Sequence, residues 1–188
     1  MTPRNRSLWI VLMVPVLGIA LGFLLRTAAM RTTSSTEVTE QPGGLPEAPL
    51  DFELPDLEGD LVRAQDLRGR VLLLDLWATW CGPCRTQAGI LAPLAAEYAE
   101  SVVFLGVNVG EDERTVSEHL DGEPLAYRVV LDRADALGSV LDVHALPTVV
   151  LVDTEGRVRF LRQGITGEPQ LRRELAKLGA TPAAATST

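Results

Sequence analysis

The chain has 188 residues, of which 46% are hydrophobic, so we expect one folded domain with appended segments. No acidic residue precedes position 37, and four of the 17 basic residues do, which leaves 13 basic against 25 acidic residues, a formal charge of −12, in the remainder. An acidic domain offers no basic patch for phosphates, which argues against a nucleic-acid binder. Two cysteines are too few for a disulfide framework.

The N-terminal segment contains an uncharged apolar run over residues 7–25, with arginines on both sides. As a helix this run spans about 28 Å, close to the ~30 Å hydrocarbon core of a bilayer. We therefore predict a transmembrane anchor over residues 1–26, with the N terminus in the cytoplasm and the rest of the chain on the periplasmic side. The alternative is a signal peptide cleaved near Thr27-Ala28-Ala29, which would yield a secreted protein.

The segments on either side of the domain have simple compositions. Residues 27–49 are rich in Thr, Ser, Pro and Gly without apolar periodicity, which predicts a flexible linker. A folded domain is expected over residues 50–179. Residues 180–188 have small side chains, and we predict a disordered tail.

Within the domain, the apolar patterns predict strands and helices in alternation. The expected elements are a hairpin over 51–63, a strand over 71–77, a helix over 82–98, a strand over 101–109, a helix over 110–120, a strand over 127–131, a helix over 134–143, a strand over 148–153, its hairpin partner over 157–161 and a helix over 168–178. Helical crossovers imply parallel pairing, and the closing hairpin adds antiparallel strands. The prediction is an α/β fold with a mixed central sheet and helices on both faces.

Both cysteines, Cys81 and Cys84, lie between the predicted central strand and the helix that follows it. The free N–H groups and the dipole of a helix N-terminus stabilise a thiolate there. We predict that Cys81 is the nucleophile, that Cys84 resolves the mixed disulfide, and that the pair alternates between dithiol and disulfide. A zinc site would need two more ligands, and His119 and His144 are too far apart in sequence for paired ligand spacing, so no metal or cofactor is expected.

Asp75 is the one polar residue in the predicted central strand. The other residues of this strand are apolar, which is typical of a strand covered on both faces. Asp75 is therefore expected to be buried, with its pKa raised by desolvation. It could then exchange a proton with Cys84. The alternative is an exposed aspartate at the end of the strand.

Pro147 precedes a predicted strand, between Leu146 and Thr148. A cis bond there would expose backbone for pairing with an extended peptide. Since only about 5–6% of X–Pro bonds are cis, the residues alone favour an ordinary trans proline.

Three separated features together resemble the thioredoxin family. Trp80-Cys-Gly-Pro-Cys84 resembles its redox motif, Asp75 stands where thioredoxins have a buried acid, and Leu146-Pro147-Thr148 resembles the segment with the cis-proline. The resemblance is closer still to the TlpA/ResA-like membrane-anchored branch, because residues 55–59, 66–71 and 107–132 resemble its N-terminal hairpin, its connector and its insertion.

This resemblance implies a thioredoxin-like three-layer sandwich with an N-terminal β-hairpin, an inserted αβ segment and a cis Pro147. It also implies a substrate-binding rim around the redox-active Cys81–Cys84 disulfide. The residues of that rim would be Trp80, Gly82, Pro83, Leu146, Pro147 and Thr148.

The implied activity is extracytoplasmic thiol–disulfide oxidoreduction. The clients would be disulfide-containing exported proteins, and a membrane thiol transporter would supply electrons. Some relatives serve cytochrome c maturation, but that branch usually has Glu where this chain has Thr148. Many relatives also have Asn, Glu and Pro at the positions of Asp75, Gln87 and Gly89. These departures favour a more general client.

Two other functions stay open at this point. A peptide-binding module could carry Cys81–Cys84 as a purely structural disulfide. A peroxiredoxin would have a P-x-x-x-T-x-x-C pattern, and the chain lacks it because Thr79 stands only two residues before Cys81.

Overall fold

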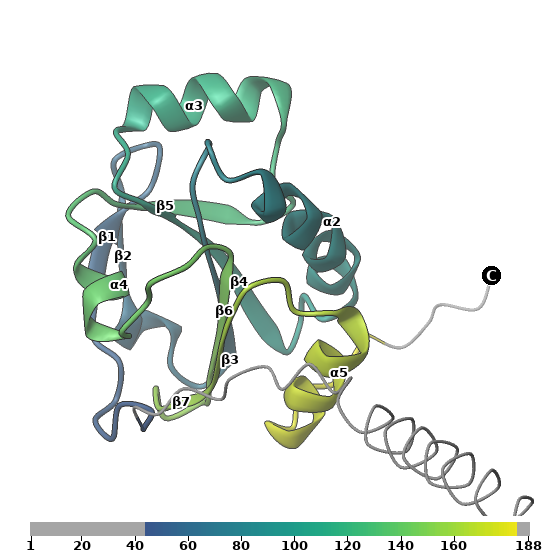
Figure 1. Ribbon diagram of the computed structural model, residues 1–188. Helices are drawn as coiled ribbons and strands as arrows, with labels where there is room; N and C mark the ends of the chain where they lie inside the picture. The colour runs from purple at the N-terminus through teal and green to yellow at the C-terminus, as the bar shows by residue number, and fades with distance from the viewer. Residues whose placement is uncertain (1–43, 184–188) are drawn as a thin grey trace, which may run out of the picture. The chain divides into compact units, whose positions relative to one another are not determined.

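The computed structural model describes residues 44–183 (Figure 1). Its elements are β1 (Glu53–Pro55), β2 (Leu61–Arg63), a 3-10 helix η1 (Ala64–Leu67), β3 (Val71–Trp77), α2 (Gly82–Glu97), β4 (Val102–Val109), α3 (Glu113–Gly122), β5 (Arg128–Asp132), α4 (Ala136–Val140), β6 (Thr148–Val152), β7 (Val158–Gln163) and α5 (Glu168–Lys177). The order of strands and helices agrees with the order predicted from the sequence, with shifts of a few residues at the ends.

Five strands form the central sheet in the order β5-β4-β3-β6-β7. β3 pairs parallel with β4 and antiparallel with β6, so the sheet is mixed as predicted. All seven residues of β3 are buried, because the strand has a neighbour on each edge and a layer on each face. Asp75 lies at the middle of this arrangement, paired with Gly106 on one side and Val149 on the other.

The two faces of the sheet are covered by different elements, which gives three layers (Figure 1). On one face, α2 and α5 bury leucines such as Leu91 and Leu171 against Leu73 of β3. On the other face, α4 and the β1–β2 hairpin pack against Leu74 and its neighbours. The predicted thioredoxin-like sandwich is therefore confirmed for the described residues.

The predicted insertion forms α3 and the edge strand β5, which runs parallel to β4. The N-terminal hairpin docks on this insertion through Asp56. Its buried carboxylate accepts hydrogen bonds from the Arg128 side chain and from the backbone N–H groups of Glu58 and Asp60. The guanidinium of Arg128 holds the pKa of Asp56 below its usual value.

The first four residues of the predicted tail, 180–183, lie within the described residues. Ala180 is buried against the cluster under α2 and α5, and the Ser101 hydroxyl donates to the Thr181 carbonyl oxygen at 2.6 Å. The Ala183 N–H donates to the Glu97 carbonyl oxygen at 2.7 Å. The burial of Ala180 and these backbone hydrogen bonds therefore hold residues 180–183 against the fold, while the side chains of residues 181–183 are exposed.

The predicted anchor at residues 1–26 lies outside the described residues, as does the linker up to residue 43 and the tail after residue 183. Among residues 44–183, no helix is long and apolar enough to cross a bilayer.

Candidate active site

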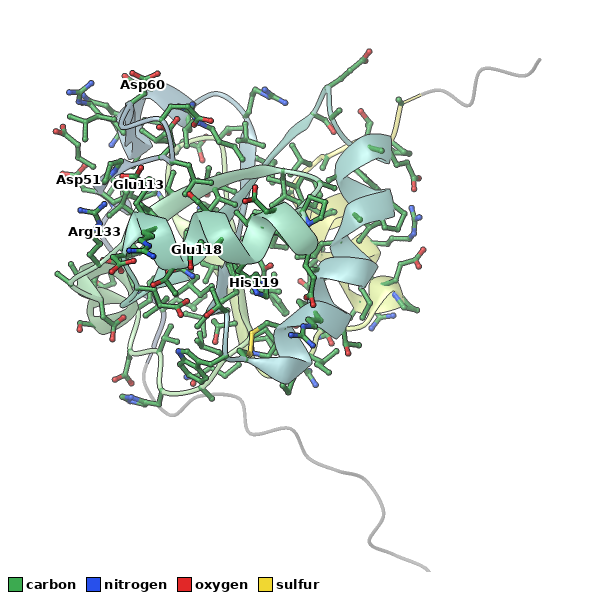
Figure 2. The ribbon with its side chains drawn as sticks, turned by 90° about the horizontal axis from the view of Figure 1, so that it is seen from above. Asp51, Asp60, Glu113, Glu118, His119 and Arg133 are labelled. Atoms are coloured by element: carbon green, nitrogen blue, oxygen red, sulfur yellow. A yellow bond between two sulfur atoms is a disulfide. The ribbon has the colours of Figure 1, made fainter. Side chains whose placement is uncertain are left out.

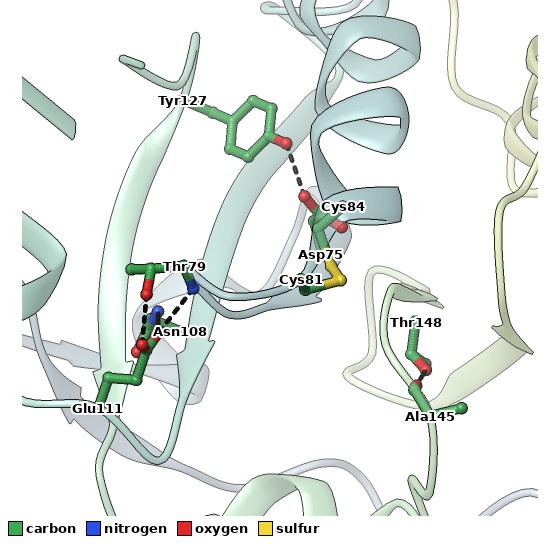
Figure 3. Close-up of a disulfide and its surroundings, with 9 residues drawn as sticks. All are labelled: Asp75, Thr79, Cys81, Cys84, Asn108, Glu111, Tyr127, Ala145 and Thr148. Carbon is green, nitrogen blue, oxygen red and sulfur yellow. Dashed lines mark hydrogen bonds between the residues drawn. A yellow bond between two sulfur atoms is a disulfide. The ribbon is translucent and has the colours of Figure 1, made fainter. Parts of the chain in front are cut away.

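The redox motif lies where β3 passes into α2 (Figure 3). Cys81 and Cys84 form a disulfide, with their Cα atoms 5.4 Å apart. Cys81 is the N-cap residue of α2, and the Cys84 N–H donates to its carbonyl oxygen at 3.1 Å. Pro83 occupies the first turn, where a missing N–H costs nothing. The sequence therefore places both sulfurs at the positive end of a helix, as predicted.

The rim of the disulfide is exposed, whereas the cysteines are covered. Trp80 is 73% exposed, and Gly82 and Pro83 are exposed as well. Cys81 and Cys84 are 5% and 4% exposed, so the two residues are equally buried in the disulfide.

The segment before β6 lies across the disulfide from Thr79 (Figure 3). The Leu146–Pro147 bond is cis, which confirms what the resemblance implied and overturns the trans bond favoured by the residues alone. Pro147 and Thr148 are buried, and the Thr148 hydroxyl donates to the Ala145 carbonyl oxygen at 2.6 Å. The side chain of Thr148 thus holds its own loop, and binding of a client by these residues stays a prediction.

Asp75 is 1% exposed, so the expectation of burial is confirmed. Burial raises the pKa of its carboxyl group to about 7, while a hydrogen bond from the Tyr127 hydroxyl opposes this rise. That hydroxyl donates to Oδ2 of Asp75 at 2.7 Å. No sequence motif marks Tyr127, which the apolar pattern predicts only as the first residue of a strand.

A pocket of about 240 Å³ joins Asp75 to the disulfide. Its walls are Asp75, Trp77, Ala78, Thr79, Cys81, Cys84, Arg85, Ala88, Gly89, Ala92, His119, Glu123, Pro124, Leu125 and Ala126. His119 lies on the side of α3 that faces the disulfide (Figure 2), with its ring centroid 5.7 Å from that of Trp77. At the mouth, the Arg85 guanidinium pairs with the Glu123 carboxylate at 2.6 Å.

Glu111 holds the loop that carries the motif (Figure 3). Its carboxylate accepts hydrogen bonds from the Thr79 N–H at 2.8 Å, the Thr79 hydroxyl at 2.5 Å and the Asn108 amide at 2.7 Å. The helix predicted over residues 110–120 would have Glu111 in its first turn. The helix instead begins at Glu113 and is capped by Asp112, whose side chain accepts from the Thr115 N–H, so Glu111 is available for the loop.

Gln87 fixes the other flank of α2. Its side chain is fully buried, accepts a hydrogen bond from the Thr166 N–H at 2.7 Å and donates to the Thr166 carbonyl oxygen at 3.3 Å. From the sequence, Gln87 was notable only because many relatives have Glu at its position. In the structure it fastens the active-site helix to the segment before α5.

Comparison with known proteins places this geometry in a family. The sequence model of the Redoxin family matches residues 45–176. The thiol-disulfide oxidoreductase ResA of Geobacillus kaustophilus is 33% identical over 129 residues, which are 68% of this chain and 74% of that protein. The chain belongs to the Redoxin family, in its TlpA/ResA-like branch.

Solved structures of similar proteins agree with the assignment. A candidate thiol:disulfide interchange protein DsbE from Chlorobium tepidum is 28% identical, with a TM-score of 0.64 over 72% of this chain and 96% of that chain. The dsbF protein of MTB is 25% identical, with a TM-score of 0.63 over 72% of this chain and 99% of that chain. The chain is thus a thioredoxin-like thiol–disulfide oxidoreductase, whose substrates are disulfide-containing proteins. Within residues 44–183, no cluster of three His, Cys, Asp or Glu side chains is arranged to hold a metal ion.

In this Redoxin fold, replacing Glu111 by alanine is expected to loosen the motif loop. The change removes the acceptor of three hydrogen bonds, one of them from a backbone N–H, and should lower the free energy of unfolding by about 2–3 kcal/mol. Urea unfolding measures the loss, and hydrogen exchange at the Thr79 amide should become faster.

The matched control is Glu113→Ala, which removes an exposed pair with Arg133 at 3.5 Å. Such a surface pair contributes at most about 1 kcal/mol. Equal losses for the two variants would show that Glu111 has no special part in holding the loop.

Proposed function

We propose that this protein is an extracytoplasmic reductant that transfers two electrons from its Cys81–Cys84 dithiol to disulfides of exported proteins. The observation that carries the proposal is the position of the cysteines at the N-terminus of α2, next to a buried Asp75 in a shared pocket. The uncharged run at residues 7–25 supports a membrane anchor with the domain outside the cytoplasm.

In the proposed cycle, the Cys81 thiolate attacks a client disulfide, and one client sulfur leaves as a thiolate. Cys81 is the nucleophile because the helix N-terminus favours its thiolate. Asp75, whose pKa is raised to about 7, takes the proton of Cys84. The Cys84 thiolate then attacks the Cys81 sulfur, which forms the Cys81–Cys84 disulfide and releases the second client sulfur as a thiolate.

The client is expected to bind along the rim of the disulfide. The exposed indole of Trp80 offers an apolar platform, and Gly82 and Pro83 leave the approach to Cys81 open. The segment Leu146, Pro147 and Thr148 is the proposed docking site of an extended client segment, with the Leu146 backbone as its pairing partner. The Pro147 carbonyl oxygen already accepts from the Gly164 N–H, and Thr148 pairs within the sheet.

Recharging requires a donor on the membrane side, because an extracytoplasmic domain has no access to cytosolic thiols. We propose a membrane thiol transporter in this role. A part in cytochrome c maturation would be a narrower role within the same activity. Thr148, which stands where the dedicated branch has Glu, favours a broader set of clients.

Insulin reduction with a dithiol as electron source tests the activity. The wild type should accelerate the reaction, and its reduction potential should lie near the about −270 mV of thioredoxin. A potential below about −300 mV without insulin reduction would instead indicate a structural disulfide in a peptide-binding module. Labelling of Cys81 in intact cells by a membrane-impermeant maleimide tests the location, since a cytoplasmic domain would stay unlabelled.

A further inference from the structure

The carboxyl group of Asp75 is held by one of its two oxygens. Oδ2 accepts a hydrogen bond from the Tyr127 hydroxyl at 2.7 Å. Oδ1 is buried and has no hydrogen-bond partner among the residues that the structure describes. Figure 3 shows the carboxyl group between Tyr127 and the first turn of α2, with one oxygen toward the tyrosine and the other on the side of Cys84. The two oxygens are therefore not equivalent.

Oδ1 of Asp75 can exchange a proton with the Cys84 thiol. Asp75 and Cys84 line the same pocket, so their side chains share one space. The mouth of this pocket is formed by Arg85 and Glu123, whose side chains are 61% and 46% exposed. A proton on Asp75 therefore has a route to Cys84 and a route to solvent.

We propose that Tyr127 is a positioning residue for the proton transfer between Asp75 and Cys84. The inference rests on the proposed function, in which Asp75 takes the proton of Cys84. By binding Oδ2, the tyrosine hydroxyl fixes the plane of the carboxyl group and leaves Oδ1 as the oxygen that exchanges the proton. Because a donated hydrogen bond stabilises the carboxylate more than the neutral acid, Tyr127 also sets the pH at which Asp75 can act as a base.

No other group around Asp75 among the described residues donates a hydrogen bond to its carboxyl group in place of the Tyr127 hydroxyl. Its partners in the sheet, Gly106 of β4 and Val149 of β6, carry no charge. The ionisable groups that line the pocket are Cys84 and Arg85 of α2, His119 of α3 and Glu123 after it, together with Cys81. Arg85 and Glu123 pair with each other at the mouth. Desolvation raises the pKa of Asp75, and the Tyr127 hydrogen bond opposes that rise.

In the mixed disulfide between Cys81 and a client, Oδ1 of Asp75 takes the proton from the Cys84 thiol. The Cys84 sulfur bonds to the Cys81 sulfur, and the bond between Cys81 and the client sulfur breaks. The client sulfur leaves with the electron pair as a thiolate, and the proton on Asp75 passes to this thiolate or to water through the pocket. Two electrons move from the dithiol to the client disulfide.

The test uses Tyr127→Phe, which removes the hydroxyl and keeps the ring that packs 6.2 Å from Phe104 between centroids. The reduced protein is mixed with dithiobis(nitrobenzoate), whose first thiolate reports attack by Cys81 and whose second reports resolution by Cys84. Stopped-flow absorbance gives the rate of the second phase against pH. The Asp75 carboxyl band in infrared spectra of the oxidised protein gives its protonation without turnover.

The wild-type midpoint should lie at about 7 in the infrared titration of the oxidised protein, and the midpoint of the second kinetic phase is compared between the variants. In Tyr127→Phe both midpoints should rise by about one pH unit, since a hydrogen bond to a charged group has this order of effect on a pKa. The control is Tyr98→Phe, the other tyrosine of the chain, which lies at the far end of α2 against Arg172. It should leave both midpoints unchanged.

Unchanged midpoints in Tyr127→Phe would overturn the inference. Asp75→Asn separates this failure from that of the proposed mechanism. If Asp75→Asn alters the pH profile while Tyr127→Phe does not, only the role of Tyr127 is lost. If Asp75→Asn also leaves the profile unchanged, the proton role of Asp75 fails and the inference falls with it.

Discussion

Cys84→Ser is expected to turn the protein into a trap that stays covalently bound to its clients. Cys81 would still attack a client disulfide, but no second thiol would remain to release the mixed disulfide. Cys81→Ser should reduce insulin no faster than the dithiol alone, because the thiolate at the N-terminus of α2 is gone. Non-reducing electrophoresis of membranes should show adducts for Cys84→Ser that disappear on reduction.

Both variants lack the Cys81–Cys84 disulfide, so each controls for the effect of its loss on stability. Only the position of the remaining thiol differs between them. Adducts formed by Cys81→Ser in place of Cys84→Ser would reverse the assignment of nucleophile and resolving residue. Mass spectrometry of the trapped partners then identifies the clients, and the proposed location requires that they be exported proteins.

The sequence predicted those features that depend on local pattern. The apolar run of β3 and the C-x-x-C at the start of α2 were enough to place the disulfide at a helix N-terminus. The burial of Asp75 followed from the same run, because both faces of a covered strand are buried and its polar side chain is therefore buried too. The cis bond before Pro147 required the resemblance to a family, since local residue preferences favour the trans form.

The contacts that tune and support the site were not predictable in this way. Tyr127 is 52 positions from Asp75, and Glu111 is 32 positions from Thr79. Gln87 and the Thr166 backbone are 79 positions apart. Hydrophobic periodicity says which face of an element is buried, but not which polar groups meet there once the layers pack. Each of these pairs joins the motif region to the insertion or to the segment before α5.

Replacing Asp75 by asparagine is expected to change stability in a pH-dependent way. The pKa of Asp75 is raised from 3.8 to about 7 in the folded protein, so the folded state binds more protons than the unfolded state between these values. The stability that this group contributes is fully present below about pH 4 and is lost as the pH rises through about 7. Between about pH 5 and about pH 8, the wild type should lose about 3 kcal/mol of unfolding free energy through this residue.

Asp75→Asn should not show this loss, since the amide does not ionise, and its Oδ1 can still accept the Tyr127 hydrogen bond. Urea unfolding of both oxidised proteins at the two pH values measures the difference. The same variant should slow client reduction above neutral pH, where the wild-type carboxylate acts as a base. Parallel pH dependences of stability would mean that Asp75 titrates normally, and the proton that Cys84 gives up would then have to go elsewhere. The expected result is that Asp75 lowers the free energy of unfolding at neutral pH and raises the rate of client reduction there. That combination would show that Asp75 serves the reaction and not the stability of the fold.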